Sequence, residues 1–279
     1  MQNSINLTPH LYNYGIDELA YYDQGKGEQT ILLIHGFGED HAIWKNQIEF
    51  LSTHYRVIAP NLPGVHCKPL ALHHSQAPNI RMYVEVLHEL MHHLHIEQYY
   101  IVGHSMGGYI GLSFADYYVN HVQGLLLFHS TTYEDNEAKK TSRMKVAEFI
   151  QEWGVSKYLE TATPNLFGDA FKKANPAAIQ NVIDSGLGIS PEAMIQFVFA
   201  MRNRKAMTHL LQQHTIPVWM IAGEADLAVT IQDSLEQIKL LPSSNSLVLK
   251  EVGHMGMLEA TDLVNQFIKK MLVGNNDAL

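Results

Sequence analysis

The chain has 279 residues, of which 46% are hydrophobic and 17% are charged. This balance is typical of a folded protein with a large core, and the length allows one large α/β domain with an insertion or two smaller domains. The formal net charge of −9 argues against a nucleic-acid partner, because binding to a phosphate backbone requires clustered Lys and Arg. No apolar run approaches the roughly 18 residues of a membrane helix, and residues 1–6 lack the features of a signal peptide. We therefore expect a cytoplasmic protein without a membrane span.

Short apolar runs rich in β-forming residues alternate with segments of helical spacing along most of the chain. The predicted strands are Leu19–Asp23, Thr30–Ile34, Tyr55–Ala59, Gln98–Val102, Val122–His129, Pro217–Ala222 and Leu247–Glu251. Helices are predicted over 42–51, from Asn79 to about His95, and from Met106 onward. Alternating strands and helices with short connections predict a parallel sheet that is covered on both faces.

The segment 131–208 interrupts this alternation, because it contains successive helical patterns and no convincing strand. Asn175-Pro176 and Ser190-Pro191 each begin a further helix, with proline in the first turn. We therefore predict a core domain formed by residues 1–130 and 209–279, with residues 131–208 inserted between two strands as a helical cap.

Ser105 lies at the centre of the motif Gly-His-Ser-Met-Gly, residues 103–107. A serine hydroxyl is a weak nucleophile at neutral pH and needs an adjacent base. The Gly-x-Ser-x-Gly spacing is typical of a serine on a tight strand-to-helix turn, where larger side chains two residues away would collide with the neighbouring elements. Here the motif follows the apolar strand Tyr99–Val102 and precedes a glycine-rich helix start. This context makes Ser105 the candidate nucleophile, in preference to an ordinary turn serine.

With these features the chain resembles the α/β-hydrolase family, particularly its small carboxylesterases, lactonases and cofactor-free haloperoxidases, whose turn reads Gly-His-Ser-Met-Gly-Gly. The resemblance extends from the strand at Leu19 to the last predicted helix near Leu272 and is least specific in the predicted cap. It implies an α/β-hydrolase fold, with a mostly parallel central sheet flanked by helices and an inserted helical cap. It also implies a small-molecule substrate and no cofactor or metal.

In this family the nucleophile is followed by an acid after a later strand and then by a histidine near the C-terminus. Asp226 and His254 occupy these places, each just after a predicted strand, at the edge where ligands meet an open α/β sheet. The resemblance implies that His254 takes the proton of Ser105 and returns it to the leaving group, while Asp226 orients the imidazole. Glu224, two positions before Asp226, is a rival acid.

The oxyanion that develops in acyl transfer needs two fixed hydrogen-bond donors. The backbone N–H of Met106, which follows the nucleophile, is one candidate. The resemblance implies that the other is the N–H of Phe37, in the loop after the strand Thr30–Ile34, and the side chain of Phe37 is then free to line an acyl pocket. His35 and His104 lie beside these positions and are expected to be hydrogen-bonded structural residues.

The loop after the third predicted strand departs from the family pattern. Relatives usually have Asp-x-Pro-Gly there, whereas this chain has Asn-Leu-Pro-Gly over residues 61–64, followed by His66-Cys67-Lys68 in place of a small Gly-x-Ser. The loop borders the active site in the family, so its altered chemistry leaves the substrate open. Cys67, the single cysteine, has no paired base and is expected to be inert.

Seventeen histidines raise the question of a metal site. His88, His92 and His95 lie on one flank of a predicted helix, where two histidines could share an ion. A zinc site needs a third or fourth ligand, and the glutamate of an H-E-x-x-H motif is absent. A solvated helix flank is therefore the favoured interpretation.

The favoured function is hydrolysis of a small carboxylic ester, lactone or thioester through an acyl-enzyme. A C–C bond hydrolase, a haloperoxidase-like enzyme or a lyase would use the same three residues, and a slow or non-catalytic receptor could use the same scaffold. A pure binding protein has no need of all three residues, which favours an enzyme. The absence of an aspartate nucleophile argues against epoxide hydrolase and haloalkane dehalogenase chemistry.

The expected pocket is apolar and adaptable, because methionines lie near the candidate residues in the sequence or in the predicted cap: Met106, Met201, Met255 and Met257. Arg202 and Arg204 are candidates for binding a substrate carboxylate. A solvated helix end is the preferred interpretation for both.

Overall fold

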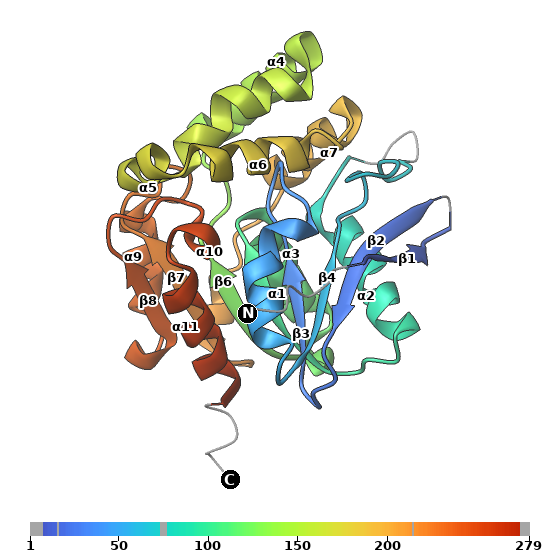
Figure 1. Ribbon diagram of the computed structural model, residues 1–279, viewed down its shortest axis with the longest axis vertical. Helices are drawn as coiled ribbons and strands as arrows, with labels where there is room; N and C mark the ends of the chain where they lie inside the picture. Colours follow the sequence, from blue (N-terminus) through green and yellow to red (C-terminus); the bar gives the residue numbers. More distant parts are fainter. Residues whose placement is uncertain (1–7, 16, 73–76, 214, 274–279) are drawn as a thin grey trace.

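The computed structural model describes residues 8–15, 17–72, 77–213 and 215–273. Within these residues, helices cover both faces of one eight-stranded sheet (Figure 1). The strands are β1 (His10–Asn13), β2 (Glu18–Gln24), β3 (Thr30–Ile34), β4 (Arg56–Pro60), β5 (Tyr99–His104), β6 (Val122–Phe128), β7 (Val218–Gly223) and β8 (Ser246–Leu249). All seven predicted strands are present, within one or two residues of their expected ends. The short, exposed β1 was not predicted, because it lacks an apolar pattern.

The strands are ordered β1-β2-β4-β3-β5-β6-β7-β8 across the sheet. β1 and β2 pair antiparallel at one edge, and all the strands from β3 to β8 run parallel. Every residue of β3, β5 and β7 is buried, as expected for central strands with helices on both faces. The carboxyl ends of the parallel strands therefore lie along one side of the sheet, called the sheet edge below. The loops after β3, β5, β6, β7 and β8 come together there.

The helices outside the long insertion pack against the two faces of this sheet (Figure 1). Their bounds are α1 (Lys45–Leu51), α2 (Ile80–His93), α3 (Met106–Tyr117), α9 (Ile231–Ile238), α10 (Gly256–Glu259) and α11 (Thr261–Val273). α1 packs against α11, and α2 packs against α3. No helix among the described residues is both long and apolar enough to span a membrane.

The chain between β6 and β7 is helical, as the sequence predicts. It contains α4 (Glu137–Ala162), the 3-10 helix η3 (Thr163–Leu166), α5 (Asp169–Ala174), α6 (Pro176–Gly186), α7 (Pro191–Arg202) and α8 (His209–Gln213). α4 is interrupted at Gly154, whose φ of +81° and ψ of 171° are not helical. Figure 1 shows α4 to α7 together beyond the carboxyl ends of the parallel strands, where α4 packs against α6 and α7.

Candidate active site

Ser105 lies on the sharp turn between β5 and α3. Its backbone has φ +51° and ψ −111°, a conformation that residues other than glycine rarely adopt. A Cβ at Gly103 would lie 2.3 Å from the carbonyl oxygen of Gly107, and one at Gly107 would lie 2.2 Å from that of Ile34. Glycine is therefore required on both sides of the turn. The Ser105 N–H donates to the Phe128 carbonyl at 2.9 Å, which anchors the turn to the adjacent β6.

Asp226 and His254 follow β7 and β8, and their buried side chains are hydrogen-bonded. His254 Nδ1 lies 2.7 Å from Asp226 Oδ2. The other carboxylate oxygen, Oδ1, accepts hydrogen bonds from the N–H groups of Ala228 at 2.8 Å and Val229 at 3.0 Å. The loop after β7 thus fixes the carboxylate, and the carboxylate fixes the imidazole. With Nδ1 donating to Asp226, Nε2 is the basic nitrogen of His254.

The electrostatics of this pair favour charge on both partners. Burial by itself raises the pKa of Asp226, but His254 and His129 outweigh burial and hold that pKa well below its usual range. Burial lowers the pKa of His254, but the Asp226 carboxylate outweighs it and raises that pKa above its usual value. Asp226 is therefore ionised at neutral pH and stabilises the positive charge that a general base acquires when it takes a proton.

A second imidazole, that of His129, also bonds to the carboxylate, and it was not among the residues predicted from the sequence. His129 follows β6 with φ +46°, and its Nδ1 lies 3.1 Å from Asp226 Oδ2. Burial lowers the pKa of His129 to about 4, so the ring is neutral and donates from Nδ1. Its Nε2 is buried and accepts no hydrogen bond from the residues described. The one signal in the sequence was that the predicted strand Val122–His129 ends in a histidine.

His104 links the loop after β3, through Glu39, to His254. Its Nδ1 lies 3.0 Å from the carboxylate of Glu39, and its Nε2 lies 2.9 Å from the carbonyl oxygen of His254. Burial raises the pKa of Glu39, but His104 and the Gly36 N–H outweigh burial and lower it below its usual range. Both partners of the imidazole are hydrogen-bond acceptors, a carboxylate and a backbone carbonyl oxygen. The expected structural role of His104 thus includes positioning His254.

Residues of the insertion also hold the loop that carries His254. The His254 N–H donates to the carbonyl of Leu166 in η3 at 2.6 Å. The carboxylate of Glu259 accepts hydrogen bonds from the N–H groups of Gly168 at 2.8 Å and Gly253 at 3.1 Å. The position of His254 therefore depends on both the sheet and the insertion.

Ser105 and His254 line one cavity of about 130 Å³ between the sheet edge and the insertion. The sheet-edge loops and α3 contribute Phe37, Glu39, Ser105, Tyr109, Ala228, Val229 and His254. The insertion contributes Arg143, Tyr158, Leu159, Ala162, Thr163, Leu166 and Met201. Of the four methionines that were expected near the pocket, only Met201 lines the cavity, while the other three are buried in the core.

Two backbone donors lie next to this cavity. Met106 is the first residue of α3, directly after Ser105, and Phe37 lines the cavity with Ser105. Among the described residues, neither the N–H of Phe37 nor that of Met106 has a hydrogen-bond acceptor. The ring of Phe37 packs against Tyr158, with centroids 5.8 Å apart. Both N–H groups are thus free to donate to a ligand.

Comparison with known proteins is consistent with this geometry. A family model described as "alpha/beta hydrolase fold" matches residues 29–177, which is more than half of the chain. The chain belongs to the α/β-hydrolase family. The family assignment confirms the resemblance inferred from the sequence and makes the protein a hydrolase by family, with esterases among its structural neighbours.

Relatives of this α/β-hydrolase have several different activities. It is 27% identical over 254 residues to the dihydrolipoyllysine-residue acetyltransferase component of an acetoin cleaving system from Pseudomonas putida, covering 87% of this chain but only 63% of that protein. It is 25% identical over 277 residues to an (E)-2-((N-methylformamido)methylene)succinate hydrolase from Acinetobacter baylyi, covering 98% and 97% of the two chains. A thermophilic esterase from Thermogutta terrifontis, solved with malate bound, superposes with a TM-score of 0.86 at 27% identity over 96% of this chain and 98% of that one.

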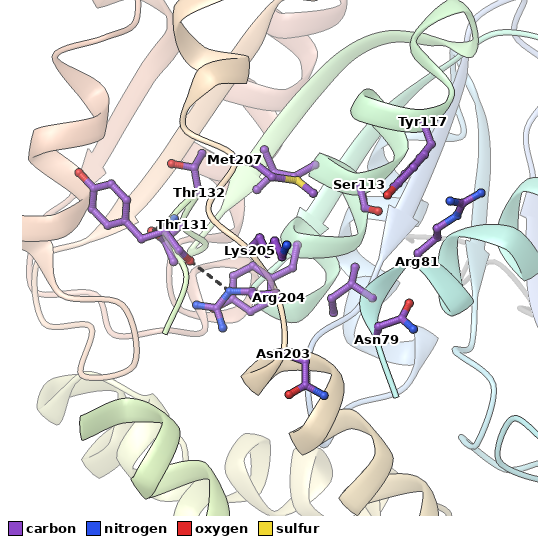
Figure 2. Close-up of a pocket in the computed structure, with 14 residues that line it drawn as sticks. Asn79, Arg81, Ser113, Tyr117, Thr131, Thr132, Asn203, Arg204, Lys205 and Met207 are labelled. Carbon is purple, nitrogen blue, oxygen red and sulfur yellow. Dashed lines mark hydrogen bonds between the residues drawn. The ribbon is translucent and has the colours of Figure 1, made fainter. Parts of the chain in front are cut away.

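A second pocket of the hydrolase, of about 250 Å³, shares only Tyr109 with the cavity at Ser105. Figure 2 shows Arg81 and Tyr117 on one side of it and Thr131 and Thr132 on the other. Neither Ser105 nor His254 lines this pocket, so it lacks the groups that acyl transfer requires.

The loop 61–68 of this hydrolase does not line the cavity, although the resemblance places it beside the active site. It contacts the insertion instead, where Val65 forms a β-bridge with Ile189 and the His66 N–H donates to the Gly188 carbonyl at 3.1 Å. The loop therefore contacts the insertion through its backbone and not the cavity that contains Ser105.

The remaining candidates from the sequence lie away from the cavity. Glu224, the rival acid, is exposed and accepts a hydrogen bond from the Glu251 N–H at 3.2 Å. Cys67 is half-buried, burial raises the pKa of its thiol, and it does not line the cavity. His88 stacks on Tyr118 with ring centroids 3.8 Å apart. The helix flank that includes His88 forms no cluster of potential metal ligands among the described residues.

Proposed function

We propose that this α/β-hydrolase cleaves small carboxylic esters, lactones or thioesters through an acyl-enzyme on Ser105. The observation that carries the proposal is that Ser105 and His254 line one cavity while the buried Asp226 holds the imidazole of His254 at 2.7 Å. His254 Nε2 takes the proton of the Ser105 hydroxyl as its oxygen attacks the carbonyl carbon, and then gives that proton to the leaving group. Water then takes the place of the Ser105 hydroxyl in the same proton transfers, attacks the acyl-enzyme and releases the acid. No step calls on a cofactor.

The N–H groups of Phe37 and Met106 are the proposed donors to the oxyanion. Both are without an acceptor among the described residues; Phe37 lies in the loop after β3, and Met106 is the first residue of α3. Donors fixed before the reaction stabilise the developing negative charge without having to reorient. The small volume of the cavity, about 130 Å³, favours substrates with short acyl groups.

We also propose that residues 131–208 act as a cap over a core formed by residues 1–130 and 209–279. The insertion supplies one wall of the cavity, which supports this division. The carbonyl of Leu166 in the insertion also accepts the hydrogen bond of the His254 N–H, so the loop that carries His254 is held by both the cap and the core. Replacement of the cap is therefore expected to change both substrate range and rate.

Labelling with a fluorophosphonate tests the proposed nucleophile. Such probes phosphonylate an activated serine, so we expect one label per chain, located on Ser105 by mass spectrometry of peptides. The same preparation should hydrolyse ethyl acetate, ethyl butanoate or γ-butyrolactone in a pH-stat, with the short acyl groups preferred. An unlabelled Ser105 together with no turnover of any of these compounds would contradict the proposed function.

The pH dependence of kcat/KM tests the role of His254. A general base must be neutral to accept a proton, and the Asp226 carboxylate raises the pKa of His254 above its usual value of about 6.5. Activity should therefore fall as the pH decreases through this raised pKa, so that kcat/KM for a neutral ester is half-maximal above pH 6.5. Circular dichroism at each pH provides the control for unfolding. A half-maximal point below pH 6.5 in folded protein would be inconsistent with this assignment.

A further inference from the structure

Arg143 is the one arginine or lysine among the residues that line the cavity with Ser105 and His254. It comes from the first part of α4, and its side chain is 18% exposed. The Arg143 Nε–H donates to Asp135 Oδ2 at 3.1 Å, which holds the guanidinium in place. Among the described residues, no acceptor is bonded to its Nη1 or Nη2 groups. The outer donors of this guanidinium are therefore available to a ligand.

The carboxylate that holds Arg143 also holds a second arginine. Arg204 Nη2 lies 2.8 Å from Asp135 Oδ1, and both side chains are almost fully buried. Two further donors of Arg204 are occupied, because its Nε–H bonds to the Tyr133 carbonyl at 3.1 Å and its Nη1 donates to the Met201 carbonyl at 2.8 Å. Arg204 is thus a buried structural residue, contrary to the expectation of a solvated helix end. It does not compete with Arg143 for a ligand.

Asp135 carries one negative charge between Arg143 and Arg204, so these three side chains together have a net positive charge. Arg143 is the member of the group that lines the cavity, and its Nη1 and Nη2 groups have no acceptor among the described residues. The two carboxylates nearest to the cavity are bonded to histidines rather than to Arg143. Glu39 is bonded to His104, and Asp226 is bonded to His254 and His129. Lys139 Nζ donates to the carbonyl of Ala228, which lines the cavity, at 3.1 Å and adds positive charge. The cavity therefore contains a guanidinium with free donors, although the whole chain carries −9.

We propose that Arg143 binds a carboxylate of the substrate, so that the preferred substrates are small esters or lactones that bear a second, free carboxylate. A guanidinium with one edge held by Asp135 presents its remaining N–H groups as a planar fork, which matches a carboxylate in bidentate geometry. The inference rests on the proposed function of this cavity and specifies its substrate class. In the reaction Arg143 is a binding residue and takes no part in proton transfer.

A pair of esters of equal acyl length tests this inference. Monoethyl glutarate carries a free carboxylate, and ethyl pentanoate does not. We expect the wild-type protein to have the higher kcat/KM for monoethyl glutarate. Arg143→Gln should lower that value about 10- to 100-fold, the range of charge-assisted hydrogen bonds, and should leave ethyl pentanoate within about 3-fold. For monoethyl glutarate, kcat/KM of Arg143→Lys should lie between the values of the wild-type protein and Arg143→Gln, because lysine keeps the positive charge but not the planar pair of donors.

Lys157→Gln is the matched control, because it removes an exposed positive charge from the same helix outside the cavity. It should change neither kcat/KM value. Glutarate should also slow fluorophosphonate labelling of Ser105 in the wild-type protein and not in Arg143→Gln, which provides a readout independent of turnover. An equal loss on both esters in Arg143→Gln would reveal a structural role and overturn the inference. If glutarate does not slow the labelling of Ser105 in the wild-type protein, the role of Arg143 is contradicted and the proposed function is not. If the wild-type protein is neither labelled nor active on any ester, the proposed function itself is contradicted.

Discussion

Replacement of Ser105 by alanine should lower kcat for ester hydrolysis by about 10⁴- to 10⁶-fold, the range found when the nucleophile of a hydrolytic triad is removed. The reason is that alanine has no hydroxyl to form the acyl-enzyme, while the proposed oxyanion donors at Phe37 and Met106 are unchanged. The measurement is proton release in a pH-stat with a short-chain ethyl ester. Labelling by a fluorophosphonate should disappear in parallel.

Ser113→Ala is the matched control for this variant. Ser113 is a buried serine on α3, the helix that follows Ser105, and does not line the cavity that contains Ser105. It should keep its labelling and its rate within about 2-fold, and both variants should retain the thermal unfolding transition of the wild-type protein. If folded Ser105→Ala keeps a tenth or more of the wild-type kcat, Ser105 is not the nucleophile.

Asp226→Asn should lower kcat at neutral pH by about 10⁴-fold, the size of effect expected when the acid of a triad no longer sets the imidazole tautomer. The Asp226 carboxylate accepts the Nδ1–H of His254, which keeps Nε2 unprotonated toward the cavity. An amide that turns its NH₂ group to His254 would favour the other tautomer and would remove the negative charge that raises the pKa of His254. Steady-state kinetics on the same short-chain ester measure the effect.

Glu224→Gln separates the two candidate acids. Glu224 is exposed and bonds to the Glu251 backbone rather than to His254, so its variant should keep kcat within about 2-fold. The assignment of Asp226 would be wrong if Glu224→Gln lost activity while Asp226→Asn kept it.

Much of the fold could be predicted because its signals are local. The continuous apolar runs at Thr30–Ile34 and Tyr99–Val102 indicate strands covered on both faces, and the prolines at Pro176 and Pro191 mark helix starts that the structure confirms. β1 was missed because a short edge strand with exposed side chains has no such pattern. The boundaries of the proposed cap at residues 131 and 208 stay a prediction.

The candidate site could be anticipated wherever a residue type is tied to a strand end. Ser105 needs glycines two residues away on both sides, and Asp226 and His254 follow strands whose carboxyl ends meet at one edge of a parallel sheet. These constraints lie in short stretches of sequence, so the sequence with its family resemblance predicted the fold class and the three residues proposed for the chemistry, and it left Glu224 open as a rival acid.

The tertiary structure decided which side chains surround those three residues. His129 reaches Asp226 across 97 positions, and His104 reaches Glu39 across 65, so no local pattern specifies either contact. The role of Arg143 depends on how α4 lies over the sheet edge and on the single carboxylate of Asp135 that it shares with Arg204. A local pattern can place a nucleophile on a turn, but the charge and shape of the cavity around it arise only when distant segments pack together.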